Sequence, residues 1–223
     1  MTNNKKLNFS IAIDGGSASG KTTGSKIISK KFGFKLLSSG KLYRLIAYKI
    51  IKNKYKYNNN FIKKISKNIS SSQLYSKKIY GSNVTNLASI IAKKKYVRSS
   101  LKQFQLDYIK KNRKIIVEGR DIASKIMPKA DLKLFFKCSV NKKAKRRYLE
   151  LKKINKKIKF KDVQKALKLR DFNDSNRKQS PLLFVRGAVL VDTTNLTKKQ
   201  LKVKLIKLVK KEIDLKKKKY GNI

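Results

Sequence analysis

The sequence predicts an α/β fold in which a parallel sheet is flanked by helices, and three observations support this prediction. Short apolar segments that are typical of buried strands alternate with longer amphipathic segments along most of the chain. The first apolar segment runs into a glycine-rich turn and then into a predicted helix. A length of 223 residues, 40% of them hydrophobic, suits one domain with a packed core.

Each expected strand is short, apolar and bounded by turn residues, and the strands cover residues 7–13, 34–37, 114–121, 131–136 and 187–194. Helices are expected where apolar residues recur at a spacing of three to four. These segments run from the glycine turn to Lys31 and over 40–51, 97–112, 142–153 and 197–213, and a further one ends at Leu169. Strands that alternate with helices imply a parallel sheet with right-handed crossovers. The tail KKKKYGNI is expected to be mobile.

One part of the chain departs from this alternation. Residues 61–95 begin with a short helix, and the Gly81-Ser82-Asn83 sequence that follows suits a hairpin turn before a further helix. We therefore expect a single domain with its core at 1–60, 97–150 and 173–223, an inserted subdomain at about 61–96 and a lid at about 150–172.

The net charge of +48 points to nucleic acid, a phosphate-rich ligand or an anionic membrane surface. Most of the lysines are interpreted as a solvated surface. If lysine is the default cation, the remaining arginines mark places where a planar, bidentate guanidinium matters. These nine positions are Arg44, Arg98, Arg113, Arg120, Arg146, Arg147, Arg170, Arg177 and Arg186.

Other residue types are informative because they are scarce. The chain has no histidine and one cysteine, Cys138, which excludes an internal disulfide, a His/Cys zinc site and a Ser-His-Asp triad. The absence of a possible internal disulfide fits a reducing, cytoplasmic location. No apolar run approaches the length of a membrane span, and the N-terminal segment lacks a cleavage site, so we expect it to be retained and folded.

The strongest motif follows the first predicted strand. Gly15, Gly20, Lys21 and Thr22 satisfy G-x-x-x-x-G-K-[ST], the phosphate-binding loop of nucleoside triphosphate-binding proteins. The glycines let successive N–H groups face one anion at a helix N-terminus. Lys21 would reach the β- and γ-phosphates, and Thr22 would hold Mg²⁺. The ATP-binding residues predicted in this way are Gly15, Gly16, Ser17, Ala18, Ser19, Gly20, Lys21, Thr22 and Thr23.

Several segments together resemble the bacterial cytidylate kinases, which use ATP to phosphorylate CMP and dCMP. These segments, in the order of that family, are IAIDGGSASGKTT, LLSSGKLYR, ASIIAKKKYVR, IIVEGRDIASKIMPKADLKLFF, AKRRYLEL, RDFNDSNRKQSPL and VLVDTTNLT. The resemblance covers nearly the whole chain, and its GRD and RDxxDSxR elements are the most specific. It implies a P-loop kinase fold with an inserted subdomain that binds the nucleoside monophosphate, and a lid over ATP.

The resemblance also implies roles for individual residues. Arg44, Arg120 and Arg177 match arginines that grip the CMP phosphate, with Ser39 in the same pocket. Ser89, Arg98 and Asp121 match residues that read the cytosine edge, and Arg170 and Asp174 match residues near the phosphates and ribose. The residues expected to serve catalysis are Lys21, Arg146, Arg147 and Arg170, with Mg²⁺ as the cofactor. We expect a monomer.

The resemblance leaves two alternatives open. Ser38 replaces the usual aspartate, the segment before LASIIA is shorter than in most bacterial members, and Arg186-Gly187 replaces an often acidic region. A kinase of broader UMP/CMP acceptor range is therefore one alternative. The other is a basic nucleic-acid-binding protein on a decayed kinase fold. Basic residues spread over every helix argue against this second alternative, and they predict only weak, non-specific binding to RNA.

Overall fold

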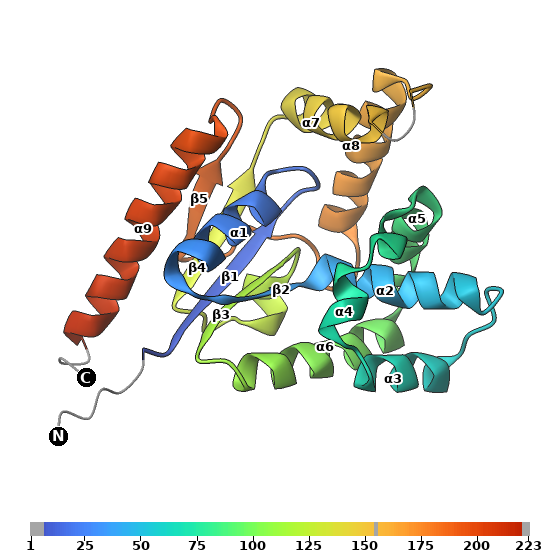
Figure 1. Ribbon diagram of the computed structural model, residues 1–223, viewed down its shortest axis with the longest axis horizontal. Coiled ribbons are helices and arrows are strands. Elements are labelled where there is room, and N and C mark those ends of the chain that lie inside the picture. Colours follow the sequence, from blue (N-terminus) through green and yellow to red (C-terminus); the bar gives the residue numbers. More distant parts are fainter. Residues whose placement is uncertain (1–6, 154–155, 220–223) are drawn as a thin grey trace. The chain divides into compact units, whose positions relative to one another are not determined.

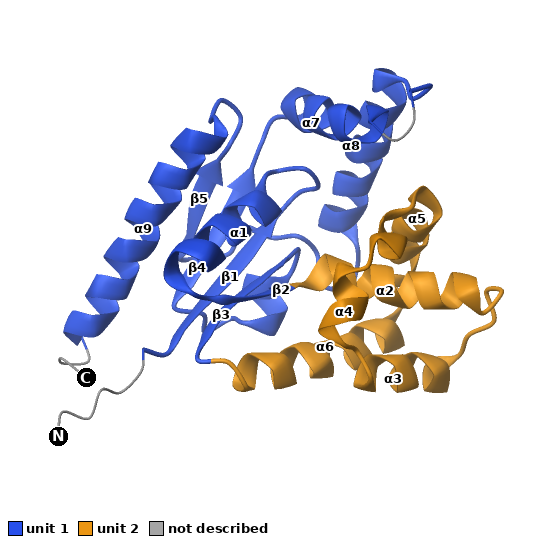
Figure 2. Ribbon diagram, in the orientation of Figure 1, with its two compact units in different colours: residues 1–37, 113–223 blue, residues 38–112 orange. Residues whose placement is uncertain are grey.

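The computed structural model describes residues 7–153 and 156–219, which fall into two compact units (Figure 2). The first unit lies within residues 1–37 and 113–223. The second unit spans residues 38–112, a longer stretch than the residues 61–96 that the sequence delimits. The first unit contains a sheet, whereas the described residues of the second are helices and connecting turns.

The first unit is built on a five-stranded sheet with the strand order β2-β3-β1-β4-β5 (Figure 1). Its strands are β1 (Phe9–Gly15), β2 (Lys35–Ser38), β3 (Lys114–Gly119), β4 (Leu132–Lys137) and β5 (Ala188–Asp192). β1 pairs in parallel with β3 and β4, and β4 pairs in parallel with β5, which confirms the predicted parallel sheet. β2 and β3 both lie on one side of β1, and the chain then crosses to the other side to form β4 and β5. The carboxyl end of β1 therefore lies at a switch point, where open α/β sheets bind ligands.

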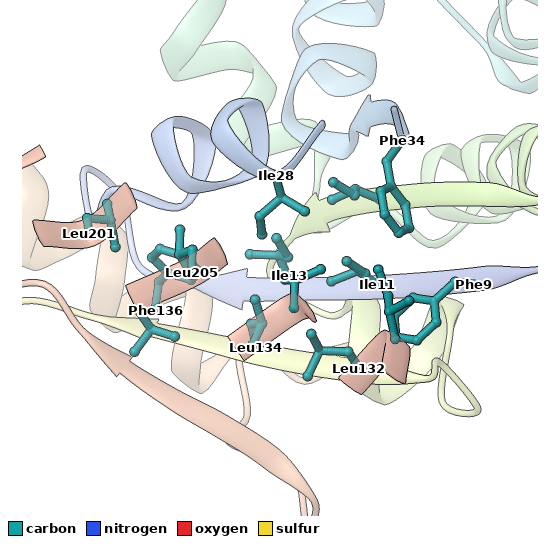
Figure 3. Close-up of a cluster of buried hydrophobic side chains, with 14 residues drawn as sticks. Phe9, Ile11, Ile13, Ile28, Phe34, Leu132, Leu134, Phe136, Leu201 and Leu205 are labelled. Atoms are coloured by element: carbon teal, nitrogen blue, oxygen red, sulfur yellow. The ribbon is translucent and has the colours of Figure 1, made fainter. Parts of the chain in front are cut away.

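Two helices cover one face of this sheet and enclose a cluster of buried apolar side chains with it (Figure 3). They are α1 (Lys21–Phe32) and α9 (Lys198–Lys219). Alternate residues of β1 and β4 point toward them, since successive side chains of a strand lie on opposite faces. The buried members of the cluster are Phe9, Ile11, Ile13, Ile28, Phe34, Ile116, Leu132, Leu134, Phe136, Val191, Leu201, Leu205, Val209 and Ile213.

The approach of α1 to this core depends on a glycine. A Cβ added to Gly24 would lie 2.6 Å from the Phe136 ring and 3.0 Å from Leu205. Because Phe136 is fully buried and carried by β4, its ring has no open space to move into. Gly24 therefore sets the distance between the helix that follows the phosphate-binding loop and the sheet.

The remaining helices of the first unit are α7 (Val140–Lys152) and α8 (Phe160–Asn176), which pack on each other through Ala144, Val163 and Leu167. β3 is followed by a single π-helical turn, η2 (Ile122–Ile126). The lid expected at about 150–172 falls on the end of α7 and most of α8, except that residues 154–155 lie outside the described ranges. Residues 1–6 and 220–223, part of the N-terminal and tail predictions, also lie outside them.

The second unit contains α2 (Ser39–Lys52), α3 (Asn59–Lys67), α4 (Ser71–Tyr75), the 3₁₀ turn η1 (Lys77–Tyr80), α5 (Ser82–Ile91) and α6 (Lys95–Lys110). The predicted hairpin around Gly81 is wrong. Ser70 caps α4 with a capping box to Gln73, Ser76 caps η1, and Gly81 precedes the first residue of α5. Gly81 is the N-cap of α5, and Ser82 and Asn83 are its first two residues, so the residues interpreted as a hairpin turn begin a helix, where glycine and serine are also common.

The other predicted strands and helices are confirmed with boundaries that shift by a few residues, except at the ends of two helices. α8 runs seven residues past Leu169, and α9 runs six residues past Ile213 into residues 216–219 of the tail predicted to be mobile. No helix among the described residues is long and apolar enough to cross a membrane.

The glycine contact yields a matched test of stability. Gly24→Ala is expected to lower the free energy of unfolding by about 1–3 kcal/mol, because overpacking outweighs the helix propensity of alanine. Gly40→Ala, in α2, meets nothing within 4 Å and is expected to leave stability unchanged or to raise it by up to about 1 kcal/mol. Urea denaturation measures both. Equal stabilisation by the two substitutions would show that α1 can move away from the sheet.

Candidate active site

The phosphate-binding loop joins the end of β1 to the start of α1. Ala18 and Gly20 have left-handed backbone conformations, with φ of 55° and 89°. A Cβ on Gly15 would lie 2.4 Å from the backbone oxygen of Phe136, so this position is closed to larger residues. Lys21 Nζ donates to Gly16 O at 2.8 Å across the loop. The loop is therefore curled with its lysine folded back over it, as anion binding by successive backbone N–H groups requires.

Thr193, after β5, supports this loop. Its hydroxyl donates to Ser19 O at 2.8 Å and accepts from Arg146 Nη1 at 3.0 Å. Arg146 Nη2 also donates to Thr193 O at 2.7 Å. The guanidinium of Arg146 thus keeps Thr193 in position, and Thr193 in turn bonds to the phosphate-binding loop. Arg147, the next residue, pairs with Glu150 at 3.0 Å on the same helix.

An acidic residue that the sequence prediction omitted lies beside the helix start. Glu118 is 3% exposed at the end of β3, and its two carboxylate oxygens accept from Thr22 Oγ1 at 3.0 and 2.9 Å. Hydroxyl and carboxylate oxygens are suitable ligands for Mg²⁺, which keeps several waters and binds few protein groups. In P-loop enzymes the metal lies between the loop Ser/Thr and an acid from a neighbouring strand, so this pair fits Mg²⁺.

Arginines and carboxylates cluster in the same unit. Arg120 Nε donates to Asp174 Oδ2 at 2.8 Å. Arg177 approaches Asp174 at 3.6 Å and Asp121 at 3.8 Å, and Arg177 Nε donates to Ser180 O at 2.6 Å. The predicted residues Arg120, Asp121, Asp174 and Arg177 are therefore brought together from the end of β3 and the end of α8.

The electric environment of the cluster changes two pKa values. Burial alone would raise the pKa of Asp174, but the guanidiniums of Arg120, Arg170 and Arg177 lower it overall. Burial, with the nearby Arg120 and Arg170, lowers the pKa of Lys21 to about 7. Lys21 and the arginine cluster therefore influence one another electrostatically, and a region of buried cations favours an anion such as phosphate.

The phosphate loop carries a carboxylate contact in this structure. Ser17 N donates to Asp171 Oδ1 at 2.9 Å, and Asp171 Oδ2 pairs with Lys143. A Cβ on Gly16 would lie 3.1 Å from both Asp171 oxygens. The Asp171 carboxylate therefore takes a loop N–H group of the kind that phosphate oxygens use.

Asp14, at the end of β1, positions the segment that carries Arg120 and Asp121. Its two oxygens accept from the backbone N–H groups of Ile122 at 2.9 Å and Ala123 at 2.7 Å. Asp14 is 2% exposed. Burial raises its pKa to about 6 although both hydrogen bonds oppose the shift. The carboxylate thus holds the start of η2 in place.

The second unit carries the other predicted acceptor residues. Ser39, the first residue of α2, is buried at 4% exposure. Arg44 lies over the Tyr80 ring at 5.2 Å. Arg98 lies over the Tyr43 ring at 5.8 Å and donates to Ala92 O at 3.1 Å. Ser89 is half-buried in α5. Both arginines are therefore held against tyrosines, which limits their rotamers.

The sequence prediction gave no site role to four residues that shape the first unit: Glu118, Lys143, Asp171 and Thr193. A signal existed for Glu118, which ends an apolar strand that pairs with β1. The other three come from distant segments, and their contacts with or near the loop arise only when α7, α8 and the end of β5 meet it.

Comparisons with known proteins identify the family of the chain. Residues 11–211 match the family model described as cytidylate kinase. The chain is 33% identical over 226 residues to the cytidylate kinase of Caldicellulosiruptor saccharolyticus, which covers 94% of this chain and 98% of that protein. It is 36% identical over 206 residues to the cytidylate kinase of Fusobacterium nucleatum, which covers 85% and 92%.

Two solved structures share the fold. TT1252 from Thermus thermophilus superposes with a TM-score of 0.51 at 14% identity, over 93% of this chain and 98% of that chain. An uncharacterized protein from Eubacterium ventriosum gives a TM-score of 0.51 at 13% identity, over 91% and 98%.

The contact of Asp171 with the phosphate loop generates a binding prediction. Asp171→Asn is expected to lower the Kd for ATP about three- to tenfold, because it removes a negative charge that competes with phosphate at Ser17 N–H. Asp162→Asn, on an exposed turn of the same α8, is the charge-matched control and should leave the Kd unchanged. Isothermal titration calorimetry measures both values. Weaker ATP binding in Asp171→Asn would show that the carboxylate supports the loop instead.

Asp14 generates a pH prediction. Its folded-state pKa of about 6 lies above the ordinary 3.8, so the folded protein binds more protons than the unfolded chain between these values. The resulting stability is present at low pH and is lost as pH rises through about 6. Relative to Asp14→Asn, the free energy of unfolding should fall by about 1 kcal/mol from pH 5 to pH 7. Urea titrations of both proteins at pH 5, 6 and 7 measure this fall. If the free energies of unfolding of the unmodified protein and of Asp14→Asn change in parallel with pH, the raised pKa of Asp14 is contradicted.

Proposed function

Because the chain belongs to the cytidylate kinase family, we propose that it transfers the γ-phosphoryl group of ATP to the 5′-phosphate of CMP and dCMP. It is a nucleoside monophosphate kinase. The observation that carries the mechanism is the placement, in one unit, of a curled phosphate loop, the Thr22–Glu118 oxygen pair and a buried arginine cluster. Phosphoryl transfer relies chiefly on positioning and charge neutralisation, and this combination supplies both.

The donor phosphates would be held by the loop N–H groups from Gly16 to Thr22 and by Lys21. The low pKa of Lys21 reflects burial beside arginines, and an added phosphate charge would favour its protonated form. Arg146 acts at a distance in this proposal, since its guanidinium holds Thr193, which bonds to the loop. Arg147 lies on the same helix, where the lid begins.

The residues that would hold Mg²⁺ are Thr22 and Glu118, whose oxygens already face one another. When bound, the metal neutralises charge that develops on the phosphate oxygens. Glu118 is held at the end of β3, which pairs with β1 immediately before the loop, so the sheet brings Glu118 to the start of α1, where Thr22 lies.

Arg120, Arg170 and Arg177 of the first unit would grip the acceptor phosphate, and Arg44 and Ser39 of the second unit are proposed to bind the same nucleotide. A guanidinium fork matches two oxygens of a phosphate. No protein general base is needed, because the acceptor phosphate is ionised at neutral pH. Asp174 would accept from a ribose hydroxyl while its three arginine neighbours keep it ionised.

Recognition of cytosine is assigned to Ser89, Arg98 and Asp121. A carboxylate accepts from the exocyclic amino group of cytosine, and a guanidinium donates to the ring carbonyl. Uracil presents the opposite pattern at the position of the amino group, so turnover of UMP measures how strictly these residues discriminate.

The function is tested by ADP release with Mg²⁺ and ATP in the presence of CMP, dCMP, UMP, AMP or GMP. Turnover is expected to be largely confined to CMP and dCMP. Lys21→Ala should lower kcat/KM by about 10²-fold or more, because it removes a cation at the transferring phosphates. Lys26→Ala, an exposed lysine of the same helix, is the matched control and should be unchanged.

No turnover with any of the five acceptors would refute the proposed activity. Equal turnover of UMP and CMP would instead establish the broader acceptor range.

A further inference from the structure

A groove lies between α3 and α6, within the second unit, and no role above uses it. It encloses about 990 Å³, at the upper end of the range for small-molecule sites. Its wall on α6 is one continuous helical face that runs from Lys95 to Lys111. We call it the α3–α6 groove.

This groove is separate from the predicted acceptor residues of the unit. Tyr96 lines the groove, whereas Arg98 lies two positions further along α6 and so points about 200° around the helix axis. The guanidinium of Arg98 is directed to Tyr43 and to Ala92 O. One face of α6 therefore lines the groove, and the opposite face carries Arg98, which contacts Tyr43 and Ala92.

The lining of the groove combines aromatic rings with cations. Phe104 and Tyr108 stack with centroids 6.3 Å apart, and Tyr96 lies on the same face. The lysines that line it are Lys63, Lys67, Lys95 and Lys111. Its one acidic residue, Asp107, accepts a hydrogen bond from Gln103 at 2.8 Å. Rings that present a face for stacking, interspersed with cations, are typical of sites for single-stranded nucleic acid.

A buried hydroxyl gives an independent indication of a ligand. Ser66 lines the groove and is 4% exposed, and its Oγ has no hydrogen-bond partner among the described residues. A buried polar group without a partner costs free energy, so such a group in a native protein needs an explanation. A ligand that offers a phosphate or sugar oxygen would supply the missing hydrogen bond.

The length of the groove distinguishes a strand from a single nucleotide. Lys95 begins α6 and Lys111 directly follows its end, so the two lysines are sixteen residues apart, or about 24 Å along the helix axis. Cations that are spread over this distance match the repeated phosphates of a chain, whereas one nucleotide has its charge at a single point. Lysines are common all over this protein, so the concave shape, the rings and the Ser66 hydroxyl distinguish the groove from the rest of the surface.

We propose that the α3–α6 groove binds a short segment of single-stranded nucleic acid, with phosphates along the lysines and bases on the rings of Phe104 and Tyr108. This site is additional to the kinase reaction and does not depend on it. The diffuse, weak RNA binding expected from the +48 charge alone would have no preferred location, so the two are distinguishable by mutation.

The test is fluorescence anisotropy of a labelled oligouridylate of about ten nucleotides, a length within the range bound by known single-strand sites. Lys63→Gln combined with Lys95→Gln should weaken binding about tenfold and reduce the slope of log K against log salt by about 1.4. Lys64→Gln combined with Lys102→Gln removes the same charge from exposed positions of the same two helices outside the groove. This control should change binding less than twofold.

A second variant, Tyr108→Leu, tests stacking and should weaken binding about tenfold. Kinase turnover of both groove variants should equal that of the unmodified protein, and Lys21→Ala should bind the probe normally, which separates this site from the catalytic one. If the groove pair and the control pair of substitutions weaken probe binding equally, the general charge of the protein explains the binding and the proposal is overturned. Full competition by free CMP or ATP at the same nucleotide concentration would also overturn it, in favour of a mononucleotide.

Discussion

The first unit depends on a few buried carboxylates that balance the cations gathered at the carboxyl edge of its sheet. The chain has twelve acidic residues against sixty lysines and arginines, and five of those acids contact the phosphate loop, the start of α1, the start of η2 or the arginine cluster. Unpaired buried charges are costly, and removal of one partner of a buried pair costs about 3–5 kcal/mol. The acids at this edge therefore cannot be treated as interchangeable surface groups.

These carboxylates have partners of different kinds. Asp14 holds two N–H groups of η2, Glu118 faces Thr22, and Asp174 lies among guanidiniums. A phosphate that enters such a region meets cations already oriented by hydrogen bonds, so little reorganisation is needed when charge shifts during transfer. Asp171 differs from the others because it occupies a loop N–H group that phosphate would use.

The second unit uses another means of orientation. Arg44 and Arg98 lie over tyrosine rings, and Lys41 lies 3.8 Å from the centroid of Tyr75. Aromatic faces hold cations without neutralising them, so these side chains keep their full charge for an anionic ligand. Because the chain has few acids, aromatic rings orient some of the cations that carboxylates would orient in other proteins. Aromatic rings and cations also occur together in the α3–α6 groove.

The sequence by itself determined the parallel α/β fold, the phosphate loop and the arginine positions, because strand periodicity and the glycine-lysine motif depend on neighbours in the chain. It failed at Gly81, where serine and glycine serve helix starts as readily as hairpin turns. Only the tertiary structure paired Thr22 with Glu118, brought Asp171 to Ser17 and engaged Arg146 with Thr193. Those contacts join residues 47 to 154 positions apart, and local patterns carry no information about which distant segments will pack together.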